Sequence, residues 1–166
     1  MKLTIFTKKK LFLLGIFIAV LVAFFDLLSK RLIFAILEQQ GLENPVIKIC
    51  DFFSFVYVWN RGVSFGMFNH LENSHIIFSV LQGSIALILI FWLYRNQEKH
   101  FTYALGLIIG GALGNVVDRI KNGAVADFLD FHIATYHWPA FNLADSCVFI
   151  GVMILLFDEI VFKKKI

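Results

Sequence analysis

Four apolar segments divide the chain, and each approaches the roughly 20 residues that a helix needs to cross a bilayer. The second, Ile76–Tyr94, contains no charged residue, and the first stays apolar up to Asp26. The fourth is the weakest, because Ser146–Phe157 reaches spanning length only if Asp145 and the acidic residues at 158 and 159 are included. The predicted spans are approximately 11–30, 76–94, 101–120 and 141–162.

The distribution of Lys and Arg predicts how these spans are oriented. Basic residues concentrate at both termini and in the short link 95–100, whereas the segment 33–74 carries two basic and four acidic residues. Since basic loops stay in the cytoplasm, both termini and the link should be cytoplasmic, and segments 33–74 and 122–140 should be extracytoplasmic. We expect an all-α integral membrane protein, a four-helix bundle with its N- and C-termini inside.

One outer segment has the composition of a β-strand. Phe52–Trp59 is β-branched and aromatic, with Asp51 before it and Asn60-Arg-Gly62 after it, a pattern typical of a strand. Its aromatic side chains suit the headgroup layer of a membrane. The sequence therefore predicts a small extracytoplasmic β-sheet that rests on the bilayer.

Composition supports a membrane environment. The chain has 166 residues, enough for a single domain covering 1–166, of which 59% are hydrophobic and 16% charged, whereas soluble proteins carry roughly a quarter charged residues. A net charge of +3 gives no reason to expect nucleic acid as a partner, and basic termini suit anionic phospholipid. Cys50 and Cys147 form no metal or disulfide pattern, so we expect both to be packing residues.

Carboxylates gather at one depth of the predicted bundle. Counted at 1.5 Å per residue from the cytoplasmic ends, Asp26, Asp118 and Asp145 come at about 24, 26 and 27 Å. Asp127 and Asp130 follow the third span closely. Because charged groups in lipid are costly, these five should face each other or an aqueous pocket. The sequence predicts a polar cluster at the outer mouth of the bundle.

Glycine spacing indicates which face of the third span packs against protein. Gly106, Gly110 and Gly114 form a stripe that lets a second helix approach closely, and Asp118 is the next position at that spacing. Two polar pairs, Asn115/Arg119 and Asp26/Lys30, also have a spacing of four residues, which places each pair on one face.

Several interpretations that involve no catalysis fit the same polar residues. Asn142 followed by Asp145 resembles a capping box, in which the carboxylate only stabilises a helix start. The charged pairs at the ends of the first and third spans could be purely structural. Intramembrane carboxylates also mark ion-coupled transporters, and a glycine stripe also serves assembly factors. These alternatives stay open on spacing alone.

The sequence gives less support to a metal site or to a catalytic serine. His132 and His137 share no helix face and have no evident third ligand, so we expect no metal and no other cofactor. Ser64 and Ser146 have no obvious His–Asp pairing. Two aspartates in a partly dry pocket, by contrast, can share one proton, so that one activates water while the other protonates the leaving group. The residue pattern alone does not say which two of the five aspartates form this pair.

Three blocks carry a resemblance to a known family: "NRGVSFGMF" (60–68), "GNVVDRIKNGAVADFLDF" (114–131) and "PAFNLADS" (139–146). Together with the early Asp26-x-x-x-Lys30 they resemble the signature blocks of lipoprotein signal peptidase, or signal peptidase II, in order and over essentially the whole chain. That family consists of inner-membrane aspartyl endopeptidases. They cut signal peptides from prolipoproteins just before a diacylglyceryl-modified Cys, and cyclic lipopeptides such as globomycin inhibit them.

The resemblance also implies roles for individual residues. Asp127 and Asp145 would be the catalytic pair. A second set would orient this pair, the substrate or an inhibitor, namely Asn60, Gly62, Asn115, Arg119 and Asn142. A third set would give polar support, namely Asp26, Lys30 and Asp118. We further expect Asp145 to be the initial base, because a helix N-terminus favours its ionised form, and Asp127 the acid. The segment 60–68 is a candidate cover for bound substrate because it contains Gly62 and Gly66.

Overall fold

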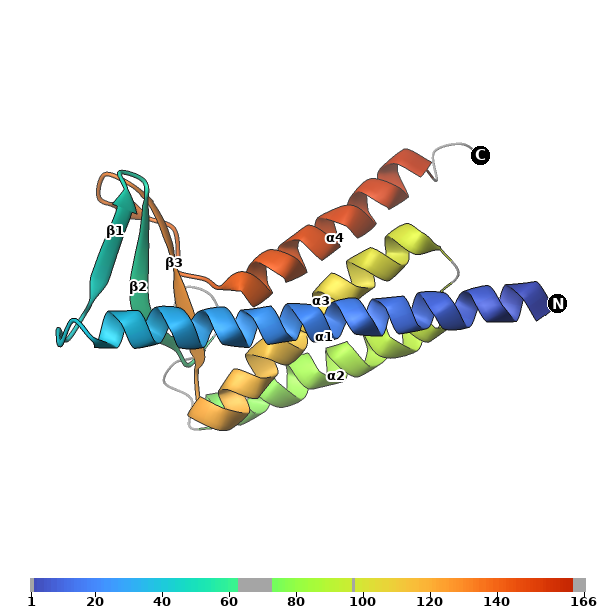
Figure 1. Ribbon diagram of the computed structural model, residues 1–166, viewed down its shortest axis with the longest axis horizontal. Coiled ribbons are helices and arrows are strands. Elements are labelled where there is room, and N and C mark those ends of the chain that lie inside the picture. Colours follow the sequence, from blue (N-terminus) through green and yellow to red (C-terminus); the bar gives the residue numbers. More distant parts are fainter. Residues whose placement is uncertain (1, 63–72, 97, 163–166) are drawn as a thin grey trace.

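The computed structural model describes residues 2–62, 73–96 and 98–162, which form four helices and one antiparallel sheet. The helices are α1 (Lys2–Glu38), α2 (Ser74–Arg95), α3 (Lys99–Asn122) and α4 (Leu143–Phe162). The strands are β1 (Val46–Cys50), β2 (Phe53–Asn60), β3 (Val125–Ile133) and β4 (Tyr136–His137). The sheet lies at one end of the helices, and α1 begins and α4 ends at the opposite end (Figure 1).

Three of these helices, α1, α2 and α3, are long and apolar enough to cross a membrane. Helix α4 has 20 residues, but every stretch of 18 within it contains three acidic residues, Asp145, Asp158 and Glu159. Large apolar side chains are exposed along α1, α2 and α4, for example Phe17, Leu87 and Phe149. Such faces suit contact with lipid chains, because water would disfavour them.

Helix α1 extends beyond the predicted boundary. We expected the outer segment to begin at residue 33, yet the helix continues to Glu38. Its last turns carry Phe34 and Leu37, which pack with Ala126 and Phe128 of β3 in a separate apolar cluster. The helix is longer than the predicted span because these side chains are covered by the sheet, so the helix that carries them does not need to stop at the end of the bundle.

Helix α3 is the centre of the bundle, and its glycine stripe packs closely against a neighbouring helix as predicted, which the structure shows to be α1. A Cβ atom added at Gly106 would lie 2.9 Å from the carbonyl oxygen of Gly15, and one at Gly110 would lie 2.5 Å from that of Ala19. The two helices therefore touch backbone to backbone. On the next face Gly111 lies against Ala144 of α4, so α3 holds both neighbours at short range.

The sheet has strand order β1-β2-β3-β4, and all its pairs are antiparallel. The strand predicted at 52–59 is confirmed as β2. Gly123, at φ 71°, ends α3 and turns the chain into β3 within two residues. Such a positive φ favours glycine, and this short turn places β3 directly across the end of the helices.

We predict that Gly110→Ala lowers the thermal unfolding temperature in detergent, because its methyl group must displace the α1 backbone at Ala19. Gly83→Ala in α2 is the matched control, since a Cβ there has no atom within 4 Å and alanine favours helix by about 0.8–1.0 kcal/mol over glycine. Equal effects of the two substitutions would show that the stripe is not a packing contact.

Candidate active site

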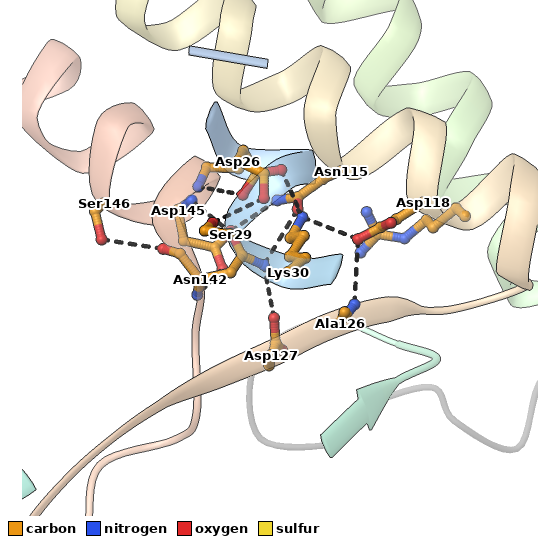
Figure 2. A network of polar contacts seen from close by, with 12 residues as sticks. Asp26, Ser29, Lys30, Asn115, Asp118, Ala126, Asp127, Asn142, Asp145 and Ser146 are labelled. Atoms are coloured by element: carbon orange, nitrogen blue, oxygen red, sulfur yellow. Dashed lines mark hydrogen bonds and ion pairs between the residues drawn. The ribbon is translucent and has the colours of Figure 1, made fainter. Parts of the chain in front are cut away.

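A buried cation connects the helices at the end that faces the sheet. Nζ of Lys30 lies 2.7 Å from Oδ2 of Asp26, 2.9 Å from Oδ2 of Asp118 and 2.8 Å from Oδ1 of Asn115. We call these four residues the Lys30 network (Figure 2). All four are buried. The predicted i,i+4 pair Asp26/Lys30 is present. Asp118 continues the glycine stripe and faces protein as expected, and the structure shows that its contact is Lys30.

The Lys30 network also holds the backbone of two further elements. Oδ1 of Asp26 accepts a hydrogen bond from the backbone N–H of Ala144 at 2.9 Å, in the first turn of α4. Oδ2 of Asp118 accepts one from Ala126 in β3 at 3.3 Å. Gly114 leaves room for this arrangement, because a Cβ there would lie 2.5 Å from Oδ2 of Asp26. The starts of α4 and β3 are thus fixed to α1 and α3 by charged hydrogen-bond acceptors.

Asn142 caps helix α4, as the capping-box pattern predicted. The backbone N–H of Asp145 donates to Oδ1 of Asn142 at 3.0 Å, and the backbone N–H of Asn142 donates to Oδ2 of Asp145 at 3.2 Å. The other oxygen of Asp145 accepts a hydrogen bond from Nδ2 of Asn115 at 2.8 Å. This carboxylate is therefore held from both sides at a helix N-terminus, which favours negative charge.

Asp127 reaches the same place from β3. Nδ2 of Asn142 donates to its Oδ1 at 2.7 Å, and Nδ2 of Asn60 donates to its Oδ2 at 3.0 Å. The same Asn142 thus contacts both Asp127 and Asp145, which we call the paired carboxylates (Figure 2). Asp127 is 2% exposed. The structure joins a strand and a helix at two carboxylates through one asparagine.

Burial and charge both act on the Asp127 carboxyl. Removal from water raises its pKa to about 7, and the nearby charge of Asp145 acts in the same direction. The hydrogen bonds from Asn60 and Asn142 oppose this shift but are weaker. Near neutral pH, Asp127 can therefore hold a proton beside a second carboxylate, which is the state that acid–base chemistry with two aspartates requires.

Arg119 borders the paired carboxylates on the side of α2. Its Nη1 donates to Oε1 of Gln82 at 2.9 Å, and its Nη2 donates to the carbonyl oxygen of Gly62 at 3.2 Å. Its Nε is buried and has no hydrogen-bond partner among the described residues. Gln82 was not in our predicted site. Its sequence signal is a long amide side chain inside a span without charges.

The predicted cluster of five carboxylates is only partly confirmed. Four of them (Asp26, Asp118, Asp127 and Asp145) share one set of hydrogen bonds, whereas Asp130 contacts His132 and His137 instead. Asp130 lies three residues after Asp127 on a strand, so its side chain points to the opposite face. Most of the predicted cover segment 60–68, with Ser64 and Gly66, lies outside the described residues.

The argument against a metal at His132 and His137 used the wrong geometry. Both residues belong to strands rather than to a helix, and they lie opposite each other in the β3–β4 pair. Asp130 supplies the third group, since one donor atom from each of the three residues lies within 4.8 Å of the others.

Comparison with solved structures places this fold among membrane enzymes. Two structures described as a bacterial membrane enzyme, solved by the in meso method, each align with a TM-score of 0.75 and 28% identity. The alignment with the first structure covers 92% of this chain and 92% of the chain in that structure. The helices, the sheet and these neighbours define the class of the protein, a membrane enzyme.

Sequence comparison defines the family more narrowly. Residues 18–161 match the family model of signal peptidase (SPase) II. A lipoprotein signal peptidase of Anaplasma marginale (strain Florida) is 40% identical over 92% of this chain and 88% of its own length. A lipoprotein signal peptidase of Burkholderia ambifaria is 43% identical over 86% of this chain and 85% of its own length. The chain belongs to the signal peptidase II family and is a protease, as its resemblance to the family predicted.

We predict that Lys30→Met strongly destabilises the protein, because it leaves the buried carboxylates of Asp26 and Asp118 without their cation. Loss of one partner from a buried ion pair costs roughly 3–5 kcal/mol, measured as the free energy of unfolding in detergent. Lys48→Met is the matched control, since the Lys48–Asp51 pair is exposed and such pairs contribute little. A small effect of Lys30→Met would contradict a structural role for the network.

Proposed function

We propose that this chain is a membrane aspartyl endopeptidase with Asp127 and Asp145 as its catalytic pair. Its substrate is a prolipoprotein whose Cys carries a diacylglyceryl group, and it cuts the bond just before that Cys. The observation that carries the proposal is the placement of two carboxylates from separate elements on one residue, Asn142, whose backbone N–H donates to Asp145 and whose side-chain amide donates to Asp127. Membership of the signal peptidase II family supports the choice of substrate.

In the proposed mechanism the ionised Asp145 removes a proton from water, which attacks the carbonyl carbon of the scissile peptide bond. Asp127 donates its proton to the carbonyl oxygen as the tetrahedral intermediate forms. In the second step Asp145 gives the proton it took from water to the leaving nitrogen, and Asp127 takes a proton back from a hydroxyl group of the intermediate. The C–N bond then breaks and the signal peptide leaves with a carboxylic acid end. No covalent enzyme intermediate is required.

The neighbouring polar groups have supporting roles in this proposal. Asn60 and Asn142 orient Asp127, and Asn115 orients Asp145. Arg119 and Gly62 form the polar wall where the substrate backbone or the polar groups of an inhibitor such as globomycin would bind. The Lys30 network keeps the helix and strand that carry the pair in register. No metal ion takes part in these steps.

We also propose the predicted membrane arrangement. All of 1–166 forms one domain of the bacterial inner membrane, with four spans, both termini in the cytoplasm and the sheet outside among phospholipid headgroups. The start of α1 and the end of α4 lie at the end opposite the sheet, which supports termini on one side (Figure 1). A site at the outer membrane surface fits a substrate whose lipidated Cys stays in the outer leaflet.

Transport is the second candidate function, and the positions of the buried charged residues argue against it. The buried charged residues of the described chain, from Asp26 and Lys30 to Asp127 and Asp130, gather at the sheet end. A path across the bundle would need polar groups along its length. The described bundle interior is instead apolar, with Leu93, Leu105 and Ile109 at its centre.

We expect Asp127→Asn and Asp145→Asn each to reduce cleavage of a diacylglyceryl-modified prolipoprotein by about 10²–10⁴-fold or more, the usual contribution of general acid–base groups. The assay uses purified protein in lipid, with mass spectrometry to confirm an N-terminal lipidated Cys on the product. Asp51→Asn, an exposed carboxylate in the turn between β1 and β2, is the matched control and should keep full activity. Full cleavage by either of the first two variants would defeat the proposal.

The pH dependence of kcat/KM follows from the raised pKa of Asp127. The acid must be protonated, so its usable fraction falls as pH rises through its pKa of about 7. We expect kcat/KM to fall about tenfold per pH unit above that value, on an enzyme that stays folded over the range. A profile that is flat from pH 6 to 9 would exclude Asp127 as the acid.

A further inference from the structure

The end of the sheet brings three metal-binding side chains to one face. Asp130 and His132 are two residues apart on β3, so they point to the same side. His137 lies directly opposite His132 in the register of β3 and β4, a position whose side chain shares that face. A turn of two residues joins the strands, with Ala134 at φ 52°. We call Asp130–His137 the histidine hairpin.

The contacts within the histidine hairpin converge on the Asp130 carboxylate. Nδ1 of His137 lies 2.9 Å and 3.0 Å from its two oxygens, and Nδ1 of His132 lies 3.1 Å from Oδ2. The two imidazole rings stack with their centroids 4.9 Å apart. Two ring nitrogens and one carboxylate thus lie within 4.8 Å of one another, although the three residues come from two strands.

One of these nitrogens lacks a hydrogen bond. Nδ1 of His132 is buried, and despite its approach to Asp130 it makes no hydrogen bond with any described residue. A buried polar atom without a partner is uncommon and requires an explanation. The side chain of His137, by contrast, is 55% exposed and borders an open hollow with Tyr136 and Trp138. An ion can therefore enter from this side and find an unused nitrogen.

We propose that the histidine hairpin binds a divalent transition metal ion of the Zn²⁺ class through His132, His137 and Asp130. Two imidazoles and a carboxylate are ligands that Zn²⁺ takes at about 2.0–2.2 Å, with water in the fourth position. Mg²⁺ and Ca²⁺ prefer oxygen-only sites, which excludes them here. The donor atoms must move closer by small side-chain rotations, for which the exposed His137 has room.

This metal site is separate from the paired carboxylates. Asp127 lies on the other face of β3, so the bound ion does not take part in cleavage. Its effect is to fasten β4 and the connection that leads to α4, where Trp138 donates to the carbonyl of Phe131 at 2.8 Å and Phe141 exchanges hydrogen bonds with Leu129. That connection delivers Asn142, so metal binding should stabilise the sheet without being required for the reaction.

Cobalt titration of the detergent-purified protein, carrying no polyhistidine tag, tests this proposal. Co²⁺ in a site of four or five ligands gives visible absorption bands, and Zn²⁺ should abolish them at one equivalent. His132→Ala and His137→Ala should each weaken binding by at least about tenfold. His137→Cys should keep it, because a thiolate replaces the lost ligand. Thermal unfolding with and without Zn²⁺ shows whether each variant is folded.

His100→Ala is the control for binding elsewhere. Among the described residues there is one other group of this kind, formed by Glu98, His100 and Asp158. Removal of its histidine should leave the cobalt bands unchanged. The proposal is overturned if the wild-type protein gives no bands and binds no Zn²⁺. It is equally overturned if His100→Ala removes the binding, or if His137→Ala, shown to be folded, binds as tightly as wild type.

Discussion

The structure depends on the contact of Lys30 with two carboxylates at the end of an apolar bundle. Charged groups are costly there unless they are paired and fully hydrogen-bonded. Lys30 meets both conditions, because its three contacts come from α1 and α3 and are all shorter than 3 Å. Asp26 uses its other oxygen, Oδ1, on the backbone of α4, and Oδ2 of Asp118 accepts a second hydrogen bond from the backbone of β3. One cation thereby fixes four elements at the place where the paired carboxylates meet.

At the start of α4, two residues each have two roles. Asp145 is both the acidic member of the capping box at this helix and half of the proposed catalytic pair. Its two roles are compatible because the cap uses Oδ2, while Oδ1 faces Asn115. Asn142 also has two roles, since it caps the helix and donates a hydrogen bond to Asp127. A capping box can therefore serve as a scaffold that presents a charged acceptor to a neighbouring strand.

Local patterns predicted much of this fold and site from the sequence. Apolar runs predicted the helices, the β-branched and aromatic composition of 52–59 predicted β2, and the glycine spacing predicted the face of α3 that packs closely on another helix. Each of these patterns depends on neighbours within a few residues. The Asn142/Asp145 cap was predicted for the same reason. The depth count brought Asp26, Asp118 and Asp145 together correctly, since helices have a fixed rise.

Features that depend on strand pairing were not predicted. The depth count could not separate Asp127 from Asp130, because only the strand geometry of β3 puts them on opposite faces. The three ligands of the histidine hairpin were missed since they were tested against a helix. Helix α1 runs past its expected end because Phe34 and Leu37 find cover in a sheet built from distant residues. Gln82 was overlooked because its partner, Arg119, lies on another helix.

The proton on Asp127 is the centre of the proposed mechanism, and carboxyl NMR measures it directly. Protein labelled with ¹³C at the aspartate carboxyl carbon is titrated in detergent, and the resonance lost in Asp127→Asn identifies this residue. The account predicts a protonated Asp127 at pH 6 that loses its proton near pH 7, beside an Asp145 that the N-terminus of α4 keeps ionised. An Asp127 resonance that is fully ionised at pH 5, or a proton held by Asp145 instead, would contradict it.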